Sequence, residues 1–170
     1  MTLQRLIYAS RLARGPWTRP CGALDEERGP GLAHLLQAIV RTSVPNNLRC
    51  GVNSILIAHD GWFLQALEGP SQGVREVFER IARDERHTPP VVLREGPIGP
   101  RAFGRWIMCA HALTGIDSGA LGKFGMLERF DPVRDPLSPV LPLLIAVARQ
   151  HRSSLDFQHE HLALLARRAA

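Results

Sequence analysis

Residues 52–69 read VNSILIAHDGWFLQALEG, and this stretch decides the fold. Two apolar runs, Val52–Ala58 and Trp62–Leu67, flank a tight turn at His59-Asp60-Gly61. An Asp-Gly pair between two apolar runs is typical of a β-hairpin, because both residues tolerate the positive φ that such a turn needs. The stretch therefore predicts two antiparallel strands, and Glu68-Gly69-Pro70 closes the second of them.

The sequence on both sides of the hairpin also shows apolar patterns that predict strands and helices. In the segments expected to be strands, apolar residues alternate with other residues, and in those expected to be helices they recur every three or four residues. We expect the first helix to end at Pro45 and Asn46-Asn47, because proline and asparagine commonly end helices. The expected strands outside the hairpin are Leu3–Ser10, Val91–Arg94 and Arg105–Ala110, and the helices are Leu32–Val40 and Val74–Ile81.

This order predicts an α+β, ferredoxin-like sandwich of βαββαββ topology, with two helices on one face of a mixed sheet, over residues 1–112. Arg11–Gly31 contains three prolines and four glycines, so we expect a long loop there. The composition changes after Ala112. Residues 113–170 are expected to form a C-terminal helical extension with helices at Leu137–Gln150 and Asp156–Arg168. These helices should cover the other sheet face, which presents Ile7, Ile107 and Cys109.

Composition narrows the classes of partner. The formal charge is +5, but the arginines are spread along the chain and form no aromatic-studded basic patch, so we expect no nucleic acid partner. No apolar run approaches the ~20 residues of a membrane span, so we expect no membrane partner. The three cysteines form no C-x-x-C pair, which suits a cytoplasmic protein. We expect no metal site. His87 has no second His or Cys at the spacing of metal ligands, and His59 and His111 should be solvated. The C-terminal histidines should lie on the polar faces of helices; they are His151, His159 and His161.

Three uncharged polar residues are candidates for a site. Gln65 lies between Phe63 and Leu67 on the inner face of its strand, and burying an unpaired amide costs ~1–3 kcal/mol. Tyr8 brings a hydroxyl to the same face, and Asn47 brings an amide at the end of the first helix. Each could have a local backbone partner, and Asn47 could be a helix cap. Together they lack a nucleophile–base pair, and they suit a planar, neutral heterocycle better than a hydrolytic reaction.

Several ordered motifs then resemble one family. Residues 63–69, FLQALEG, resemble the F-x-Q-x-L-E-G signature of BLUF domains, which are blue-light sensors using FAD. Residues 80–87, RIARDERH, are similar to the R-I-x-x-D-x-R-H segment of that family, and residues 101–108, RAFGRWIM, to its R-x-F-x-x-W-x-M element. Residues 5–10, RLIYAS, resemble its opening strand, and Asn47 lies where the family keeps an asparagine. The resemblance covers Leu3 to Ala112.

The resemblance implies an FAD held between the two helices, with the Gln65 amide bridging the Tyr8 hydroxyl and the flavin ring. Blue light would move an electron, coupled to a proton, from Tyr8 to the flavin. The Gln65 amide would then rotate or change tautomer, the absorption would shift to the red, and no substrate would be turned over. The implied photoactive residues are Tyr8, Gln65, Trp106 and Met108, and the implied FAD contacts are Tyr8, Ser10, Ile39, Asn47, Gln65, Ile81, Arg86 and His87.

The resemblance also sets expectations for output. Trp106 and Met108, both expected on the inner face, would relay the switch to the C-terminal helices. Residues 113–170 are too few for an output domain, so we expect an unidentified downstream signalling protein as partner, and a homo-oligomer.

Two departures from the family leave alternatives open. Val52-Asn53-Ser54 stands where the family usually has I-T-G, and Arg11–Gly31 is longer than usual. The chain could therefore be a flavin-free BLUF-like interaction module, or a small hydrolase of acidic substrates using Arg86 and Asn47. Arg86, Asp84 and His87 could equally form a surface ion cluster, and Val40 could serve core packing alone.

Overall fold

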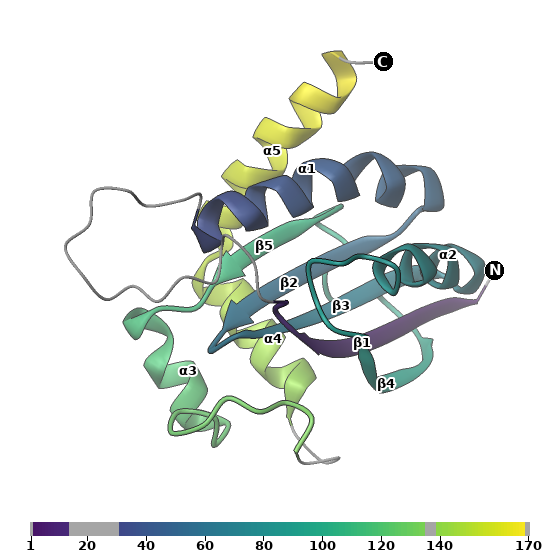
Figure 1. Ribbon diagram of the computed structural model, residues 1–170. Coiled ribbons are helices and arrows are strands. Elements are labelled where there is room, and N and C mark those ends of the chain that lie inside the picture. The colour runs from purple at the N-terminus through teal and green to yellow at the C-terminus, as the bar shows by residue number, and fades with distance from the viewer. Residues whose placement is uncertain (1, 14–30, 135–138, 169–170) are drawn as a thin grey trace.

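The computed structural model describes residues 2–13, 31–134 and 139–168, which form a five-stranded mixed sheet with helices on both faces (Figure 1). The ferredoxin-like α+β fold expected from the sequence is confirmed. Most of the expected Arg11–Gly31 loop lies outside the described residues. The sheet order is β4-β1-β3-β2-β5. The strands are β1 (Leu3–Arg11), β2 (Asn53–His59), β3 (Trp62–Pro70), β4 (Val91–Ile98) and β5 (Cys109–Ala112).

The β2–β3 hairpin forms as its sequence predicts. Asp60 and Gly61 both have positive φ, 47° and 73°, as a two-residue hairpin turn requires. β3 also pairs antiparallel with β1, and this register sets Tyr8 opposite Gln65. β5 pairs in parallel with β2 at the sheet edge. Since residues that face each other across a ladder share a sheet face, Tyr8 and Gln65 point to the same side.

Two helices, α1 (Leu32–Cys50) and α2 (Ser71–Ile81), cover this side of the sheet, in front of the strands in Figure 1. α1 is longer than expected, because it continues through Pro45 and Asn47 to a left-handed Gly51 with φ of 64°. A proline removes one helical N–H, but Val44 and Asn47 are both buried, and their packing holds the last turns against the sheet. Asn47 is therefore inside the helix rather than beyond its end.

α4 (Val140–Gln150) and the start of α5 (Arg152–Arg168) cover the opposite face, and α4 lies behind the sheet in Figure 1. The rest of α5 runs past β5 beside α1. A buried cluster joins Ile7 and Cys109 of the sheet to Leu144 of α4 and Leu155 of α5, as the sequence predicts for this face. Ile107 was expected there too, but it packs on the α1 side. The elements are η2 (Gly115–Asp117), α3 (Ser118–Lys123), α4 (Val140–Gln150) and α5 (Arg152–Arg168), of which η2 and α3 were not expected.

Two strands differ from the sequence expectation. β4 runs to Ile98 instead of Arg94, and β5 begins at Cys109 instead of Arg105. Residues 99–108 are turns and bends, held by long-range bonds such as Phe103 N–H to the buried Glu68 carboxylate at 2.9 Å. In the part of the chain that the structure describes, no helix is long and apolar enough to cross a bilayer.

Candidate functional site

The site is built around a buried hydrogen bond between Tyr8 and Gln65. The Tyr8 hydroxyl donates to Gln65 Oε1 at 2.5 Å, and both side chains are almost fully buried. On its other side, Gln65 Nε2 lies 3.5 Å from Met108 Sδ. A thioether sulfur is a weak acceptor, so the amide has one strong and one weak partner. Of the expected photoactive residues, the structure thus brings Tyr8, Gln65 and Met108 together.

The polar chain continues from Met108 to α1. Ser54 Oγ donates to Met108 Sδ at 2.8 Å, and Asn47 Nδ2 donates to Ser54 Oγ and to the Ile107 carbonyl, both at 2.9 Å. The Asn47 side chain therefore reaches across to β2 and does not cap its own helix. Ser54 was not expected to be a site residue. Its alternation with Leu56 and Ala58, which also face α1, is the signal that could have placed it.

The surroundings of Tyr8 keep its phenol protonated. The Tyr8 ring meets Phe78 of α2 edge-on, with centroids 5.6 Å apart, and lies 6.4 Å from the His87 ring. Burial raises the pKa of Tyr8 well above its ordinary value; the nearby Asp84 charge raises it further and Arg86 opposes this. The group can therefore act as a hydrogen-bond donor throughout the neutral range.

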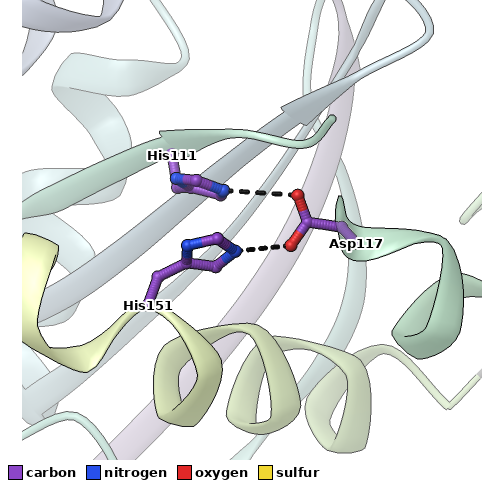
Figure 2. Close-up of side chains that lie close together, drawn as sticks. All are labelled: His111, Asp117 and His151. Carbon is purple, nitrogen blue, oxygen red and sulfur yellow. Dashed lines mark hydrogen bonds and ion pairs between the residues drawn. The ribbon is translucent and has the colours of Figure 1, made fainter. Parts of the chain in front are cut away.

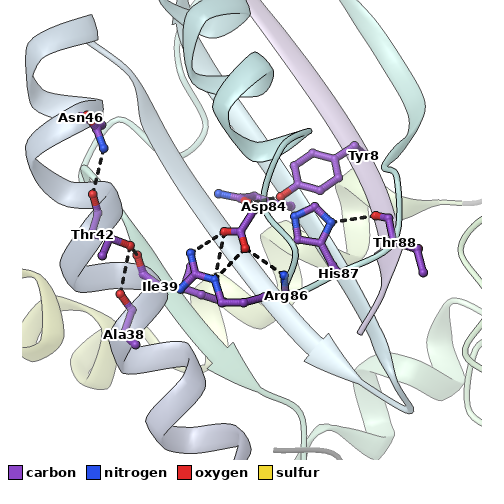
Figure 3. Close-up of polar contacts among 10 residues, drawn as sticks. Tyr8, Ala38, Ile39, Thr42, Asn46, Asp84, Arg86, His87 and Thr88 are labelled. Carbon is purple, nitrogen blue, oxygen red and sulfur yellow. Dashed lines mark hydrogen bonds and ion pairs between the residues drawn. The ribbon is translucent and has the colours of Figure 1, made fainter. Parts of the chain in front are cut away.

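Arg86 and Asp84 form an ion pair beside Tyr8 and His87 (Figure 3). Arg86 Nε donates to the two Asp84 oxygens at 2.8 and 3.0 Å, and the Arg86 backbone N–H adds a bond at 3.0 Å. Burial favours the neutral acid, but these bonds and the Arg86 charge outweigh it and lower the pKa of Asp84. His87 Nδ1 lies 2.8 Å from the Thr88 carbonyl. The Arg86–Asp84 part of the ion cluster considered from the sequence is thus present, although it is partly buried. Contact of Arg86 or His87 with a flavin stays a prediction.

Trp106 does not lie on the sheet face that the sequence predicts for it. It was expected on the inner face with Met108, but it packs in the cluster on the opposite side, with Leu155 of α5. Its indole N–H donates to Asp156 Oδ1 at 2.8 Å. The reason is that residues 101–108 are not a strand, so strand alternation does not apply to them. Trp106 contacts the C-terminal helices directly, and its part in a relay stays a prediction.

Apolar residues line the same side of the sheet. Ile39 and Val40 are buried on α1, and Ile81 packs at the end of α2 against the cluster that contains Tyr8. Ser10 lies on β1 two residues beyond Tyr8 and is 1% exposed. Among the described residues, its hydroxyl is one of two buried side-chain polar atoms without a hydrogen-bond partner. An orphaned buried hydroxyl is costly, and it indicates a missing partner.

Two residues of the FLQALEG motif have structural roles. Glu68 is fully buried and pairs with Arg5 of β1, 2.6 Å away, while it accepts the Phe103 N–H. It therefore anchors the segment that leads to Met108. At Gly69, an added Cβ would lie 2.8 Å from the Gly51 carbonyl oxygen, so the close approach of β3 to the end of α1 requires glycine.

Residues 3–109 match a family model described as sensors of blue-light using FAD. The chain belongs to the BLUF family. BLUF domains are flavin-binding blue-light receptors that act as sensory modules. The match ends just after Met108, so it covers β1 to β4, α1, α2 and the polar chain described above, but only the first residue of β5.

Curated relatives carry the same kind of domain. The chain is 30% identical over 138 residues to the photoactivated adenylate cyclase subunit beta of Euglena longa, and equally to that of Euglena gracilis. These matches cover 81% of this chain but 13% of each cyclase subunit. The chain therefore spans a small part of the curated relatives it matches.

Solved BLUF structures share the fold. The photo-activated state of BlsA superposes with a TM-score of 0.65 at 25% identity, over 84% of this chain and 94% of that chain. The dark-state structure of the BLUF protein BlrB gives 0.59 at 28% identity, over 86% and 97% of the two chains. This coverage extends beyond residue 109 into the C-terminal helices of this chain.

The residues present fit a flavin. The Ser10 hydroxyl lacks a partner, and the Gln65 amide N–H has a weak acceptor, so both can bond a heterocycle that offers nitrogen and carbonyl acceptors. The surrounding residues are apolar or uncharged, apart from the Asp84–Arg86 pair. This is the character of a site for a flat ring that needs a few oriented hydrogen bonds.

Proposed function

We propose that this protein binds FAD between α1 and α2 and senses blue light through a switch of the hydrogen bonds at Gln65. The observation that supports this most strongly is the buried Tyr8–Gln65 bond, continued by the weak contact from Gln65 to Met108. A flip of this amide would exchange Oε1 and Nε2, so it would give up the bond from the Tyr8 hydroxyl as well as the contact with Met108. The weak Met108 contact adds little to the cost of the flip, and the N–H that then faces the Tyr8 oxygen would offset part of the loss.

In this proposal the flavin is held by residues of both helices and of the sheet. Asn47 would hydrogen-bond the polar edge of the ring. Its Nδ2 now donates to Ser54 and to the Ile107 carbonyl, and one of these two bonds would be replaced by the bond to the ring. Arg86 would reach a ring carbonyl while it stays paired with Asp84. The further proposed contacts are Tyr8, Ser10, Ile39, Gln65, Ile81 and His87.

The flavin, when bound, absorbs blue light and accepts an electron. Tyr8 would supply that electron together with its hydroxyl proton and would take both back once the Gln65 amide has switched, so no net oxidation or reduction remains. The buried position of Tyr8 excludes water from the exchange. The Gln65 amide presents a carbonyl oxygen to Tyr8 before the switch and an N–H after it. Inside a low-dielectric site, the replacement of an acceptor by a donor changes every bond in the chain from Tyr8 to Asn47. No substrate is consumed, so the protein acts as a sensor and not as an enzyme.

The signal leaves the site through residues 101–112. Met108 contacts Gln65 on one sheet face, and Trp106 contacts Asp156 of α5 on the other. A change at Met108 would therefore alter the packing of the C-terminal helices, which would contact a separate downstream protein in the cytoplasm or a second copy of the chain. The relatives named photoactivated adenylate cyclases illustrate one kind of output for such a domain.

An absorption spectrum tests the proposal. The purified protein should be yellow, and chromatography of the released pigment should identify FAD rather than FMN. Blue light should shift the spectrum to the red, and darkness should reverse the shift. A folded protein that stays colourless with excess FAD would contradict the proposal and favour a flavin-free interaction module.

A further inference from the structure

A second group of polar side chains lies around the C-terminal end of β5, away from the polar chain of Tyr8 and Gln65. His111 of β5 and His151, at the C-terminal cap of α4, both direct Nε2 at the carboxylate of Asp117 (Figure 2). The two imidazole rings are neighbours, with centroids 3.8 Å apart and planes tilted by 32°. The three residues come from three different elements, and their nearest ligand atoms all lie within 4.8 Å of one another.

The carboxylate is held in place by its own neighbours. Asp117 is fully buried, and its Oδ2 accepts the backbone N–H of Thr114 at 2.8 Å. Gln150 Nε2 lies 3.3 Å from Oδ1. The histidine side chains keep 15–19% of their surface exposed, so the group can be reached from solvent. Imidazole nitrogens and carboxylate oxygens are both metal ligands in proteins, so the three side chains are of the right chemical type.

The distances come near those of a small tetrahedral ion, although the two histidines face different oxygens of Asp117. Metal–ligand bonds of ~2.0–2.1 Å at tetrahedral angles put neighbouring ligand atoms about 3.3 Å apart. His111 Nε2 and Asp117 Oδ2 are already 3.4 Å apart. His151 Nε2 and Asp117 Oδ1 are 2.5 Å apart, so an ion would break this hydrogen bond and move His151 away from the carboxylate by about 0.8 Å.

A purely structural role explains one histidine but not both. The His151–Asp117 bond and the Thr114 bond together satisfy the carboxylate and cap η2. His111 is then left too far away for a good hydrogen bond, since N–H···O bonds span 2.7–3.2 Å. Its ring nevertheless lies beside that of His151 and points at the same carboxylate. Two imidazoles directed at one carboxylate bring together three groups that can ligate a shared cation.

We propose that His111, Asp117 and His151 form a site for a divalent transition-metal ion, with Zn²⁺ as the preferred ion. Imidazole ligands select zinc, cobalt, nickel or copper over magnesium and calcium, which prefer all-oxygen sites. Three protein ligands leave the fourth tetrahedral position to water. The ion would link β5 to the junction of α4 and α5 and so tie the C-terminal helices to the strand that follows Met108.

Calorimetric titration of the full-length, chelator-treated protein with Zn²⁺ tests this site without light. We expect one equivalent to bind and the melting temperature to rise with the logarithm of the free Zn²⁺ concentration once this exceeds the dissociation constant, whereas Mg²⁺ should do neither. His111→Gln and His151→Gln should each weaken binding by more than about tenfold, the least that loss of supporting residues usually costs. His34→Gln, at an exposed position on α1, should bind as the wild type does.

A wild-type measurement covers the case in which a variant does not fold. With Zn²⁺ added, the ring proton resonances of His111 and His151 should shift by NMR, while those of His34 and His59 should not. Binding that is unchanged in both glutamine variants, or stoichiometric Zn²⁺ that leaves the His111 and His151 resonances in place, would overturn the proposal. So would a wild-type protein that binds no Zn²⁺. None of these results depends on whether the protein binds a flavin.

Discussion

Tyr8 and Gln65 face each other across two antiparallel strands, and the Tyr8 hydroxyl donates to Gln65 Oε1 at 2.5 Å. The backbone register fixes this pairing, because Tyr8 is the direct Cα partner of Gln65 on the ladder between β1 and β3. The strand geometry therefore holds the two groups in contact without any help from a loop.

Glu68 should be needed for stability. Its fully buried carboxylate pairs with Arg5 and accepts the Phe103 N–H, so Glu68→Gln leaves a partly buried cation without its counter-charge. Removal of one partner of a buried pair typically costs ~3–5 kcal/mol, and the 17% exposure of Arg5 should reduce this to about 2–4 kcal/mol. Urea unfolding measures the loss. Glu76→Gln, in an exposed pair with Arg49, is the matched control and should change stability far less. Equal losses in the two variants would refute the anchoring role of Glu68.

Tyr8 should ionise only when the protein unfolds in alkali. It is the single tyrosine of the chain, so tyrosinate absorbance reports it alone. Burial raises the pKa of Tyr8, and Asp84 raises it further against the opposing Arg86. The unfolded chain therefore loses this proton first, at about pH 10. Its contribution to stability is full below that pH and is lost as the pH rises above it.

We accordingly expect tyrosinate to appear together with the loss of the far-ultraviolet circular dichroism. Tyr8→Phe should lose less stability than the wild type above pH 10, since it has no such proton to release. Reversible tyrosinate formation near pH 10 in a protein that keeps its native circular dichroism would show that the phenol is not shielded.

Ser54 should stabilise the polar chain. Ser54→Ala removes the donor to Met108 Sδ and one acceptor of the Asn47 amide, which keeps the Ile107 carbonyl. We expect a loss of ~1–2 kcal/mol in unfolding free energy, because polar atoms in a buried site lose a partner. Thermal unfolding compares it with Ser154→Ala, at an exposed position on α5, which should change stability by less than ~0.5 kcal/mol. A neutral Ser54→Ala would mean that Met108 is held by packing alone.

The parts of the fold that local patterns determine could be predicted from the sequence. The hairpin followed from Asp60-Gly61, and the helices followed from their apolar spacing. The end of α1 could not, because burial of Val44 and Asn47 overrides the tendency of Pro45 to end a helix. Tyr8 and Gln65 were expected on one face, and the observed register confirms this.

The positions that sequence reasoning missed depend on distant partners. Trp106 lies away from Met108 because its indole bonds to Asp156, 50 residues further along. His111 was expected in solvent and His151 on a polar helix face. Both instead face the Asp117 carboxylate, although His151 lies 34 positions after Asp117 in the sequence. No local periodicity encodes contacts of this kind. Ser54 was noted as a departure from the family pattern, but its two partners come from α1 and from the segment before β5.

The light-minus-dark absorption spectrum of flavin-loaded variants tests the central claim most directly. Gln65→Leu keeps the size of the side chain but cannot bond, and Tyr8→Phe removes the electron and proton donor. Both variants should keep the fold and the flavin but show no red shift. Each leaves one buried polar group without its partner, so each should lose ~1–2 kcal/mol of unfolding free energy. Gln158→Leu is the matched control, since that amide bonds to Ala110 at the edge of β5, and it should keep the full shift. A full red shift in Gln65→Leu would contradict the account.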